Sequence, residues 1–266
     1  MSEAEVDRHL HQLLESDRVW CAYALADLDP AEAEHSTWLV SEKAVILIYK
    51  GLDPPVLFVH GDPEDLRPLV TRVPCGVYQY TLKRNCRLML ADRLQSRIER
   101  HMWRMALNHR DFPRISNVDL KRLVSDDLPA IRRLFESSPD MPDSFHERQL
   151  AIGPFFGIRE GDELLSIAGV HVLSQWAKVA AVGNVFTRSD RRGQGLATRA
   201  SAAVVKELLE QNIQTIVLNV AIDNEPALRC YRRLGFRPYC DYYEGTGTLI
   251  RDDTKVKPRD SNSTSA

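Results

Sequence analysis

Apolar residues at helical spacing open the chain and then give way to short apolar runs with strand character. The first stripe, expected on a helix over residues 3–17, consists of Val6, Leu10, Leu13 and Leu14. Another apolar segment covers 19–28, and the strand-like runs cover 37–40, 44–50, 56–60, 75–82 and 101–107. Helices are expected from Asp62 to Val73 and from Arg84 to Arg97. The first 112 residues therefore predict a complete α/β unit.

The rest of the chain alternates strands and helices in a different order after a linker at 109–114. We expect a strand at 118–124, helices at 127–135 and 141–152, strands at 154–159, 163–173 and 179–187, a helix from about 195 to 212, a strand at 213–220, a helix starting after Asn224, and one or two strands at 239–250. From Arg251 onward the chain is polar and is expected to be disordered. The predicted organisation is one α/β domain at 1–112, a second domain at 113–250, and a tail at 251–266.

Residues 184–198 are the most informative stretch, because a strand there runs into a loop that holds paired arginines and two glycines. The loop contains Arg191, Arg192, Gly193 and Gly195, and a helix begins directly after it. Glycine lets a backbone approach a ligand closely, and the first N–H groups of a helix carry partial positive charge. The stretch therefore indicates a phosphate-binding loop. Taken alone, it fits an ordinary strand-to-helix turn with solvated arginines equally well.

A second constellation lies at 224–236. Asn224 suits the N-cap of a helix whose first turn holds Glu225 and Pro226, and Gly235 suits its left-handed end. Tyr231 lies within that helix, on the face that also carries Ala227. On structural grounds alone, Tyr231 would be a packed aromatic residue and Asn224 a plain cap.

These two stretches, in this order, resemble the GNAT superfamily of N-acetyltransferases. The phosphate-loop pattern of that family, Gln/Arg-x-x-Gly-x-Gly/Ala, is met by Arg192, Gly195 and Ala197. Its later pattern, Asn-x-x-Ala-x-x-x-Tyr-x-x-x-Gly-Phe, is met at every specified position from Asn224 to Phe236. The resemblance covers roughly 117–250. It implies an α/β (α+β) fold with a mixed, splayed sheet flanked by helices. The preceding α/β domain is then a degenerate copy of the same fold or an unrelated cap.

The resemblance also implies roles for individual residues around acetyl-coenzyme A as the acyl donor. Backbone groups of the loop would hold its pyrophosphate, those at Val185 and Thr187 would pair with the pantetheine arm, and an N–H near Val185 or Phe186 would face the thioester oxygen. The proposed loop residues are Arg192, Gly193, Gln194, Gly195, Leu196, Ala197 and Thr198. Asn224 would hold the coenzyme through its amide, and Tyr231 would act as the general acid.

The general base is the weakest part of the assignment. The strand at 179–187 carries neither a carboxylate nor a histidine. His171 on the preceding strand is the candidate, acting directly or through water, although a half-exposed strand histidine without a catalytic role fits equally well. Asp241 and Glu244 rank below it.

Composition narrows the function classes. The chain has 266 residues, 35 Lys and Arg, 37 Asp and Glu, and a formal net charge of −2. This balance gives no support for nucleic-acid binding. No apolar run approaches the roughly 20 residues of a membrane span, and the charged start does not resemble a signal peptide, so we expect a cytoplasmic protein. Five scattered cysteines without a Cys-x-x-Cys pair indicate free thiols, and we expect no metal site.

The leading hypothesis is an N-acetyltransferase that moves an acetyl group from acetyl-coenzyme A to a primary amine of a small molecule or amino acid. A close alternative uses a bulkier acyl-coenzyme A, as glycine N-acyltransferases do. A different class would be a coenzyme A-binding regulatory protein without catalysis. The expected partner is a small-molecule amine, without nucleic acid or membrane, and a homodimer stays open.

Overall fold

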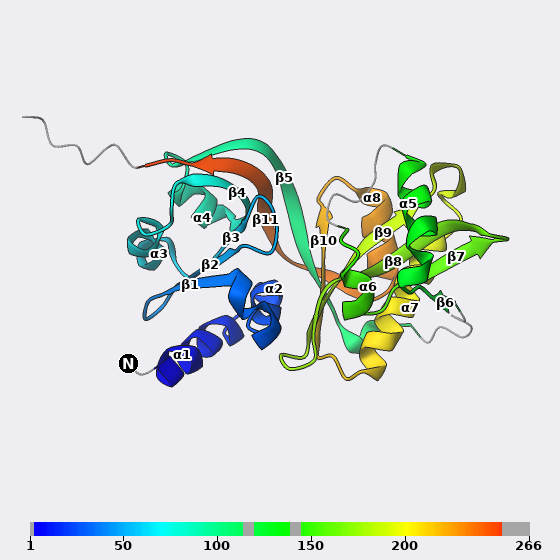
Figure 1. The fold of residues 1–266 in the computed structure, drawn as a ribbon, viewed down its shortest axis with the longest axis horizontal. Helices are drawn as coiled ribbons and strands as arrows, with labels where there is room; N and C mark the ends of the chain where they lie inside the picture. Colours follow the sequence, from blue (N-terminus) through cyan, green and yellow to red (C-terminus); the bar gives the residue numbers. More distant parts are fainter. Residues whose placement is uncertain (1–2, 114–119, 139–144, 252–266) are drawn as a thin grey trace, which may run out of the picture.

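The computed structural model describes residues 3–113, 120–138 and 145–251. The strands in these ranges form one mixed sheet with the order β1-β2-β3-β4-β11-β5-β10-β9-β8-β7-β6. Figure 1 shows two α/β parts side by side, with the long strands β5 and β11 running from one part into the other. The expected α/β class is therefore confirmed.

The first part of the sheet is built around one strand that is buried on both faces. Its strands are β1 (Ser36–Val40), β2 (Val45–Tyr49), β3 (Val56–His60) and β4 (Gly76–Lys83), and its helices are α1 (Glu3–Glu15), α2 (Ala22–Ala26), α3 (Pro63–Val70) and α4 (Arg84–Met89). All of β2 is buried. Val45 and Leu47 pack in the core beneath α1 and α2, whereas Ile46 and Ile48 pack beneath α3 and α4, as the two-residue period of a strand requires.

The second part carries the predicted site. Its strands are β6 (Lys121–Arg122), β7 (Phe156–Glu160), β8 (Glu163–Ser174), β9 (Val179–Thr187) and β10 (Thr215–Ala221), and its helices are α5 (Leu128–Glu136), α6 (Gln149–Ile152), α7 (Leu196–Glu210) and α8 (Glu225–Arg233). The buried face of α7 meets this sheet through a core that includes Val204, Leu208 and Leu218. On the opposite face, Val179 and Ala181 of β9 pack with α2.

Two long strands hold the parts together. β5 (Leu94–Leu107) pairs with β10 through residues 102–106 and with β11 (Phe236–Leu249) along its length. β11 also pairs with β4 through residues 242–249. The predicted boundary at residue 112 therefore separates β5 from both of its neighbours in the sheet. The division into two domains stays a prediction.

Most expected elements are confirmed within a few residues, but the segment at 84–97 is not. The sequence predicts one helix there, whereas α4 ends at Met89 and β5 begins at Leu94. The expected strand at 118–124 and helix at 141–152 fall partly outside the described residues, and the tail from residue 252 lies wholly outside them. No helix within the described ranges combines the length and apolarity that crossing a bilayer requires.

Candidate functional site

β9 and β10 separate partway along their length. Their parallel pairing ends at Val182 and Leu218, yet β9 continues to Thr187 and β10 to Ala221. Asn184 adopts φ +51° at the register shift of β9, which redirects the strand. The sheet is therefore splayed on the α7 side of this point, and backbone groups of β9 face the gap.

The hydrogen bonds to β8 identify which backbone groups those are. The N–H of Arg188 donates to the carbonyl of Leu165 at 2.9 Å, and Phe186 lies opposite Ile167. Alternate residues direct their backbone groups to opposite sides of a strand, so Val185 and Thr187 face the splay. These are the two residues that the sequence assigned to the pantetheine arm. Phe186, in contrast, has its side chain buried in the core.

The loop after β9 is exposed to solvent at the start of α7. Gly193 and Gly195 have φ values of +80° and +75°, which L side chains rarely adopt. A Cβ at either position would meet no atom within 4 Å, so the glycines are needed for the turn and not for internal packing. Gly195 is the N-cap of α7, and residues 192–195 are exposed. The N–H groups of the first helical turn are therefore accessible to an anion.

The neighbouring side chains divide into packed and exposed ones. Leu196 is buried against Ile158 and Leu165, Ala197 is partly buried, and Gln194 is exposed. Thr198 donates its hydroxyl to the Cys230 Sγ at 3.2 Å, which ties the first turn of α7 to α8. The loop and the tyrosine helix are thus held in contact.

The two loop arginines differ in their surroundings. Arg191 forms ion pairs with Glu160 and Asp190, so its charge is largely compensated within the protein. Arg192 donates from Nε to the carbonyl of Thr187 at 3.2 Å, and its guanidinium lies 6.0 Å from the Phe186 ring centre. The ion pairs of Arg191 make its charge less available to a phosphate than that of a solvated arginine.

Tyr231 lies in α8 and is 7% exposed. Its ring packs edge-on against Phe236 at 6.1 Å, and its hydroxyl makes no hydrogen bond to any residue that the structure describes. Burial raises the pKa of Tyr231 far above its ordinary value, so the phenol keeps its proton at neutral pH. It is therefore a proton donor with no partner of its own.

Asn224 is the N-cap of α8, as the sequence predicts. Its Oδ1 accepts from the N–H of Ala227 at 3.2 Å, which leaves the Nδ2 group of the exposed side chain to other partners. At the other end of the helix, Gly235 has φ +93° and lies against the backbone of Asp111, where a Cβ would collide.

His171 of β8 lies at the splay, half-buried, with its ring over Gly183 of β9. Its Nε2 accepts from the backbone N–H of Asn184 at 3.3 Å, and its Nδ1 lies 3.0 Å from the hydroxyl of Tyr23. Because Nε2 accepts, the neutral ring carries its proton on Nδ1 and donates it to Tyr23. Burial, together with Arg104, lowers the pKa of His171 to about 4. The imidazole is therefore neutral at physiological pH and a weak base.

A methyl group at position 183 would overlap the His171 imidazole. We expect Gly183→Ala to displace the ring and destabilise the fold by about 1–3 kcal/mol. Urea unfolding measures the effect. Gly76→Ala is the matched control, because its new Cβ would contact only Tyr78 at an ordinary 3.8 Å. Equal stability of both variants would show that the His171 ring is not fixed by Gly183.

The structure brings further polar residues to this place that the sequence analysis missed. Tyr23 and Asp27 lie one turn apart, in α2 and at its C-cap, and α2 packs on β8 and β9. Arg104 of β5 and Asn219 of β10 are directly opposite each other in register. The sequence signal for Arg104 was a single arginine within the otherwise apolar residues 102–107. Asp241, one of the lower-ranked base candidates, is already paired with His101 at 2.8 Å.

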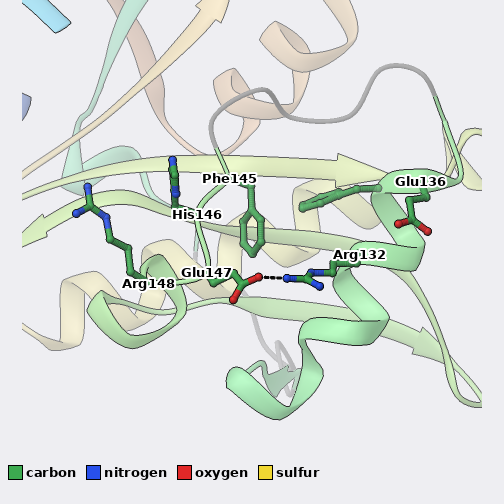
Figure 2. A pocket seen from close by; sticks show the side chains of 7 residues that line it. Arg132, Glu136, Phe145, His146, Glu147 and Arg148 are labelled. Atoms are coloured by element: carbon green, nitrogen blue, oxygen red, sulfur yellow. Dashed lines mark hydrogen bonds and ion pairs between the residues drawn. The ribbon is translucent and has the colours of Figure 1, made fainter. Parts of the chain in front are cut away.

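A cavity of about 530 Å³ lies between α5 and the segment leading into α6. Figure 2 shows the Phe145 ring beside an ion pair between Arg132 and Glu147, with Arg148 pointing away toward its own partner. That partner is the hydroxyl of Tyr49, at 2.9 Å. The cavity floor includes Phe135, whose ring packs edge-on against Phe186 of β9 at 5.6 Å. A cavity with two phenylalanines among its mostly polar lining residues therefore lies next to the strand that borders the splay.

The described residues contain no group of three or more His, Cys, Asp or Glu side chains placed to hold a metal ion. The five cysteines are free thiols. Burial raises the pKa of Cys230, the cysteine beside Tyr231, so a reactive thiolate there is disfavoured.

Comparison with known proteins points to one family. The family model for GNAT acetyltransferases matches residues 119–236. The chain is 35% identical to the mycothiol acetyltransferase of Corynebacterium aurimucosum over 75 residues, which is 27% of this chain and 25% of that protein. It is 42% identical to N-alpha-acetyltransferase 30 of Schizosaccharomyces pombe over 59 residues, which is 21% of this chain and 39% of that protein. The chain thus matches well under half the length of these two relatives.

A likeness in fold extends much further along the chain. A GCN5-related N-acetyltransferase from Kribbella flavida superimposes with a TM-score of 0.58, covering 86% of this chain and 95% of that one. At 15% identity this likeness concerns the fold alone. The likeness in fold agrees with the family match at residues 119–236. The chain therefore contains a GNAT acetyltransferase domain, which spans residues 119–236.

Proposed function

We propose that this protein transfers an acetyl group from acetyl-coenzyme A to the primary amine of a small molecule or amino acid. Acetyl transfer is what the family match supports. The observation that carries the finer proposal is the splay between β9 and β10, because β9 leads from it to the accessible N-terminus of α7. The first turn of α7 is bonded to α8, which carries the phenol of Tyr231. They offer a place for an extended thioester, an anion site and an acid.

The residues around the splay fit the donor. The pyrophosphate would bind the N–H groups of residues 193–198, with Arg192 adding charge. The backbone edge at Val185 and Thr187 would pair with an amide-bearing arm as an added strand does. Bound there, acetyl-coenzyme A would supply an activated acetyl thioester. The open space at Gly193 and Gly195 is the room that such a ligand requires.

Tyr231 would donate its proton to the departing sulfur. Its hydroxyl has no competing partner among the described residues, and its raised pKa keeps the proton in place until it is needed. Asn224 would bind the coenzyme through Nδ2 while Oδ1 caps α8.

The base is better matched by Asp27 than by His171. Both ring nitrogens of His171 have partners, and a group with pKa about 4 takes a proton poorly from an amine. Burial, together with Glu32, raises the pKa of Asp27 to about 8, despite the opposing effect of Arg148. Asp27 would remove the amine proton, directly or through water, while His171 holds the backbone at Asn184 and the hydroxyl of Tyr23.

This role for Asp27 predicts a pH dependence. The transfer rate should rise as pH increases through about 8, and Asp27→Asn should remove that rise. The acceptor amine also titrates, so the pH–rate profile should be repeated with amines of different pKa. The rise that belongs to the amine will move with the pKa of the amine, whereas the rise that belongs to Asp27 will stay in place.

The raised pKa of Asp27 also makes the stability of the fold depend on pH. The pKa of Asp27 is higher in the folded state than in the unfolded chain, so the folded wild type loses stability as pH rises from about 4 to 8. Asp27→Asn should abolish this loss, which unfolding at several pH values would detect. A rate profile unchanged by Asp27→Asn would rule Asp27 out as the base.

A bulkier acyl donor is the second candidate, and the cavity lined by Phe135 and Phe145 favours it. It adjoins Phe186 and could hold an aromatic or branched acyl group. Thiol release measured with acetyl-, isobutyryl- and benzoyl-coenzyme A against a panel of amines tests both versions. Amine-dependent release with at least one donor supports acyl transfer, and the preferred chain length chooses between them. Binding of every donor without amine-dependent release would leave a regulatory coenzyme A-binding protein.

A further inference from the structure

Arg104 is a buried cation without a carboxylate or a hydrogen-bond acceptor among the described residues. It is 1% exposed in the middle of β5, where it is among the largest fully buried side chains. Its Nε and Nη1 atoms are enclosed and make no hydrogen bond, and no carboxylate among the described residues lies within ion-pair distance of the guanidinium. An unpaired buried charge is strongly unfavourable, so a guanidinium in this state calls for an explanation.

Three aromatic rings surround the guanidinium without satisfying it. The rings of Trp20, Tyr23 and Tyr242 have their centres 5.4, 4.8 and 5.6 Å from its Cζ. Such rings stabilise a cation through their π faces. The N–H groups of a guanidinium, however, lie in its plane and need acceptors there. The rings therefore hold Arg104 in place and leave its hydrogen-bonding edge unused.

No described side chain accepts a hydrogen bond from the Nε or Nη1 of Arg104, and its polar neighbours direct donors at Tyr23. Asn219 lies directly opposite Arg104 on β10 and donates from Nδ2 to the hydroxyl of Tyr23 at 3.3 Å. His171 donates to the same hydroxyl from 3.0 Å. With two donors directed at its oxygen, Tyr23 has its own proton left for another group, and no described residue accepts it.

The orientation of the Asn219 amide does not change this balance. In the amide orientation that the structure has, the Oδ1 of Asn219 is buried and accepts no hydrogen bond from a described residue. If the amide is rotated, Tyr23 donates to Oδ1 and the unused group becomes the Nδ2 donor. In both arrangements the cluster of Tyr23, Arg104 and Asn219 has donors and positive charge in excess. That is the requirement for binding an anion.

The cluster adjoins the proposed transfer site. Tyr23 contacts His171, and His171 contacts the backbone N–H of Asn184 at the splay. On the other side, Asp27 follows Tyr23 one helical turn later, and the charge of Glu32 acts on Asp27. A cationic residue and an acidic pair thus lie on either side of one tyrosine, beside the strand edge where a thioester would bind.

We infer that the acceptor is an amino carboxylate, whose carboxylate binds Arg104 with the hydroxyl of Tyr23 and the amide of Asn219. This inference rests on the proposed function and names the substrate class of the same site. A guanidinium suits a carboxylate, because its charged N–H groups donate to carboxylate oxygens. The amino end of the same molecule then lies toward Asp27 and the splay. An amine without a carboxylate would leave the buried cation unpaired and would bind poorly.

Matched acceptor pairs test the inference. Glycine is compared with glycinamide, and β-alanine with β-alaninamide, in the wild type and in Arg104→Met, Arg104→Lys and Tyr23→Phe. The wild type should favour the acids over the amides by about 100-fold in kcat/KM, since a site built to bond a polar group rejects the analogue that lacks it. Arg104→Met should erase this preference mainly through KM, and Arg104→Lys should keep part of it. Tyr23→Phe should reduce it several-fold.

A binding measurement gives a readout that does not depend on turnover. N-acetylglycine should raise the thermal unfolding midpoint of the wild type, whereas N-acetylglycinamide should not, and Arg104→Met should respond to neither. Arg104→Met should also unfold in urea at the same concentration as the wild type or a higher one, because an unpaired charge is removed. If Arg104→Met fails to fold, the caging of Arg104 is structural, and Tyr23→Phe alone then decides whether a carboxylate binds here.

The outcomes separate this inference from the proposed function. Equal use of acids and amides by the wild type would overturn the carboxylate site while leaving amine acylation intact. Absence of acyl transfer to any amine, with binding of N-acetylglycine that requires Arg104, would overturn the function and support the anion site. No response to N-acetylglycine, together with no preference between acids and amides, would overturn the inference outright.

Discussion

Gly195→Glu should reduce the affinity for coenzyme A by about 100-fold or more. Gly195 caps α7 at φ +75° with open space around it, so a side chain there would extend into the proposed pyrophosphate site. The carboxylate would repel phosphate oxygens and compete for the N–H groups that they need. Losing two or more charge-assisted hydrogen bonds corresponds to an effect of this size. Isothermal calorimetry on the folded variant measures it.

Gly195→Ala is the matched control for this experiment. Both variants impose the same left-handed backbone strain, but alanine adds only one methyl group in a place where nothing lies within 4 Å. The two should therefore lose similar stability and differ widely in affinity. If Gly195→Glu binds coenzyme A as tightly as Gly195→Ala does, the phosphates lie elsewhere.

Tyr231→Phe should slow the chemical step by about 100-fold and leave donor binding unchanged. The substitution keeps the ring and its edge-on contact with Phe236, and it removes only a hydroxyl that has no described partner. A positioned general acid contributes a factor of this order. The factor will be smaller if the thiolate, whose parent pKa is near 8.5, leaves without full protonation. Single-turnover rates at saturating donor are the correct measurement, because slow product release then cannot hide a change in the rate of the chemical step.

Tyr78→Phe serves as the comparison for Tyr231→Phe. Tyr78 is also a buried tyrosine, but its hydroxyl donates to the carbonyl of Pro74 in the first part of the sheet, away from the splay. Tyr78→Phe should lower the free energy of unfolding and leave the rate of acyl transfer unchanged. If Tyr231→Phe and Tyr78→Phe both react at the wild-type rate, Tyr231 is a packing residue and not the general acid.

The loop and tyrosine parts of the site could be predicted because their information is local. Gly193, Gly195, Asn224 and Gly235 each sit where a turn or helix end demands their particular backbone or cap, and the structure has them in those roles. The splay at Val185 and Thr187 also follows from the resemblance, and its backbone direction is consistent with the strand register.

The error at 84–97 has a physical cause. Residues 95–100 of β5 are exposed, so the strand shows no alternation of apolar and polar positions there. Local preference in such a segment is weak, and pairing with β11 decides its conformation. That pairing joins residues more than a hundred positions apart, which periodicity cannot reveal.

The proposed acceptor-binding residues could not be predicted from the sequence for the same reason. Tyr23, Arg104, His171 and Asn219 come from four distant segments, and no spacing relates them. Of these, only His171 could be singled out, by its place on the strand before β9. Its low pKa depends on burial and on Arg104, and its hydrogen bond to Tyr23 depends on α2, which only the folded chain brings next to β8.

The central claim is that an acyl group passes from a coenzyme A thioester at the splay to an amine. Mass spectrometry after one turnover with carbon-13-labelled acetyl-coenzyme A and an amine acceptor tests it most directly. We predict one labelled amide for each free thiol in the wild type, about 100-fold slower formation in Tyr231→Phe, and almost none in Gly195→Glu at low donor concentration. Thiol release without labelled amide, or labelled amide formed equally well by Gly195→Glu, would contradict the account.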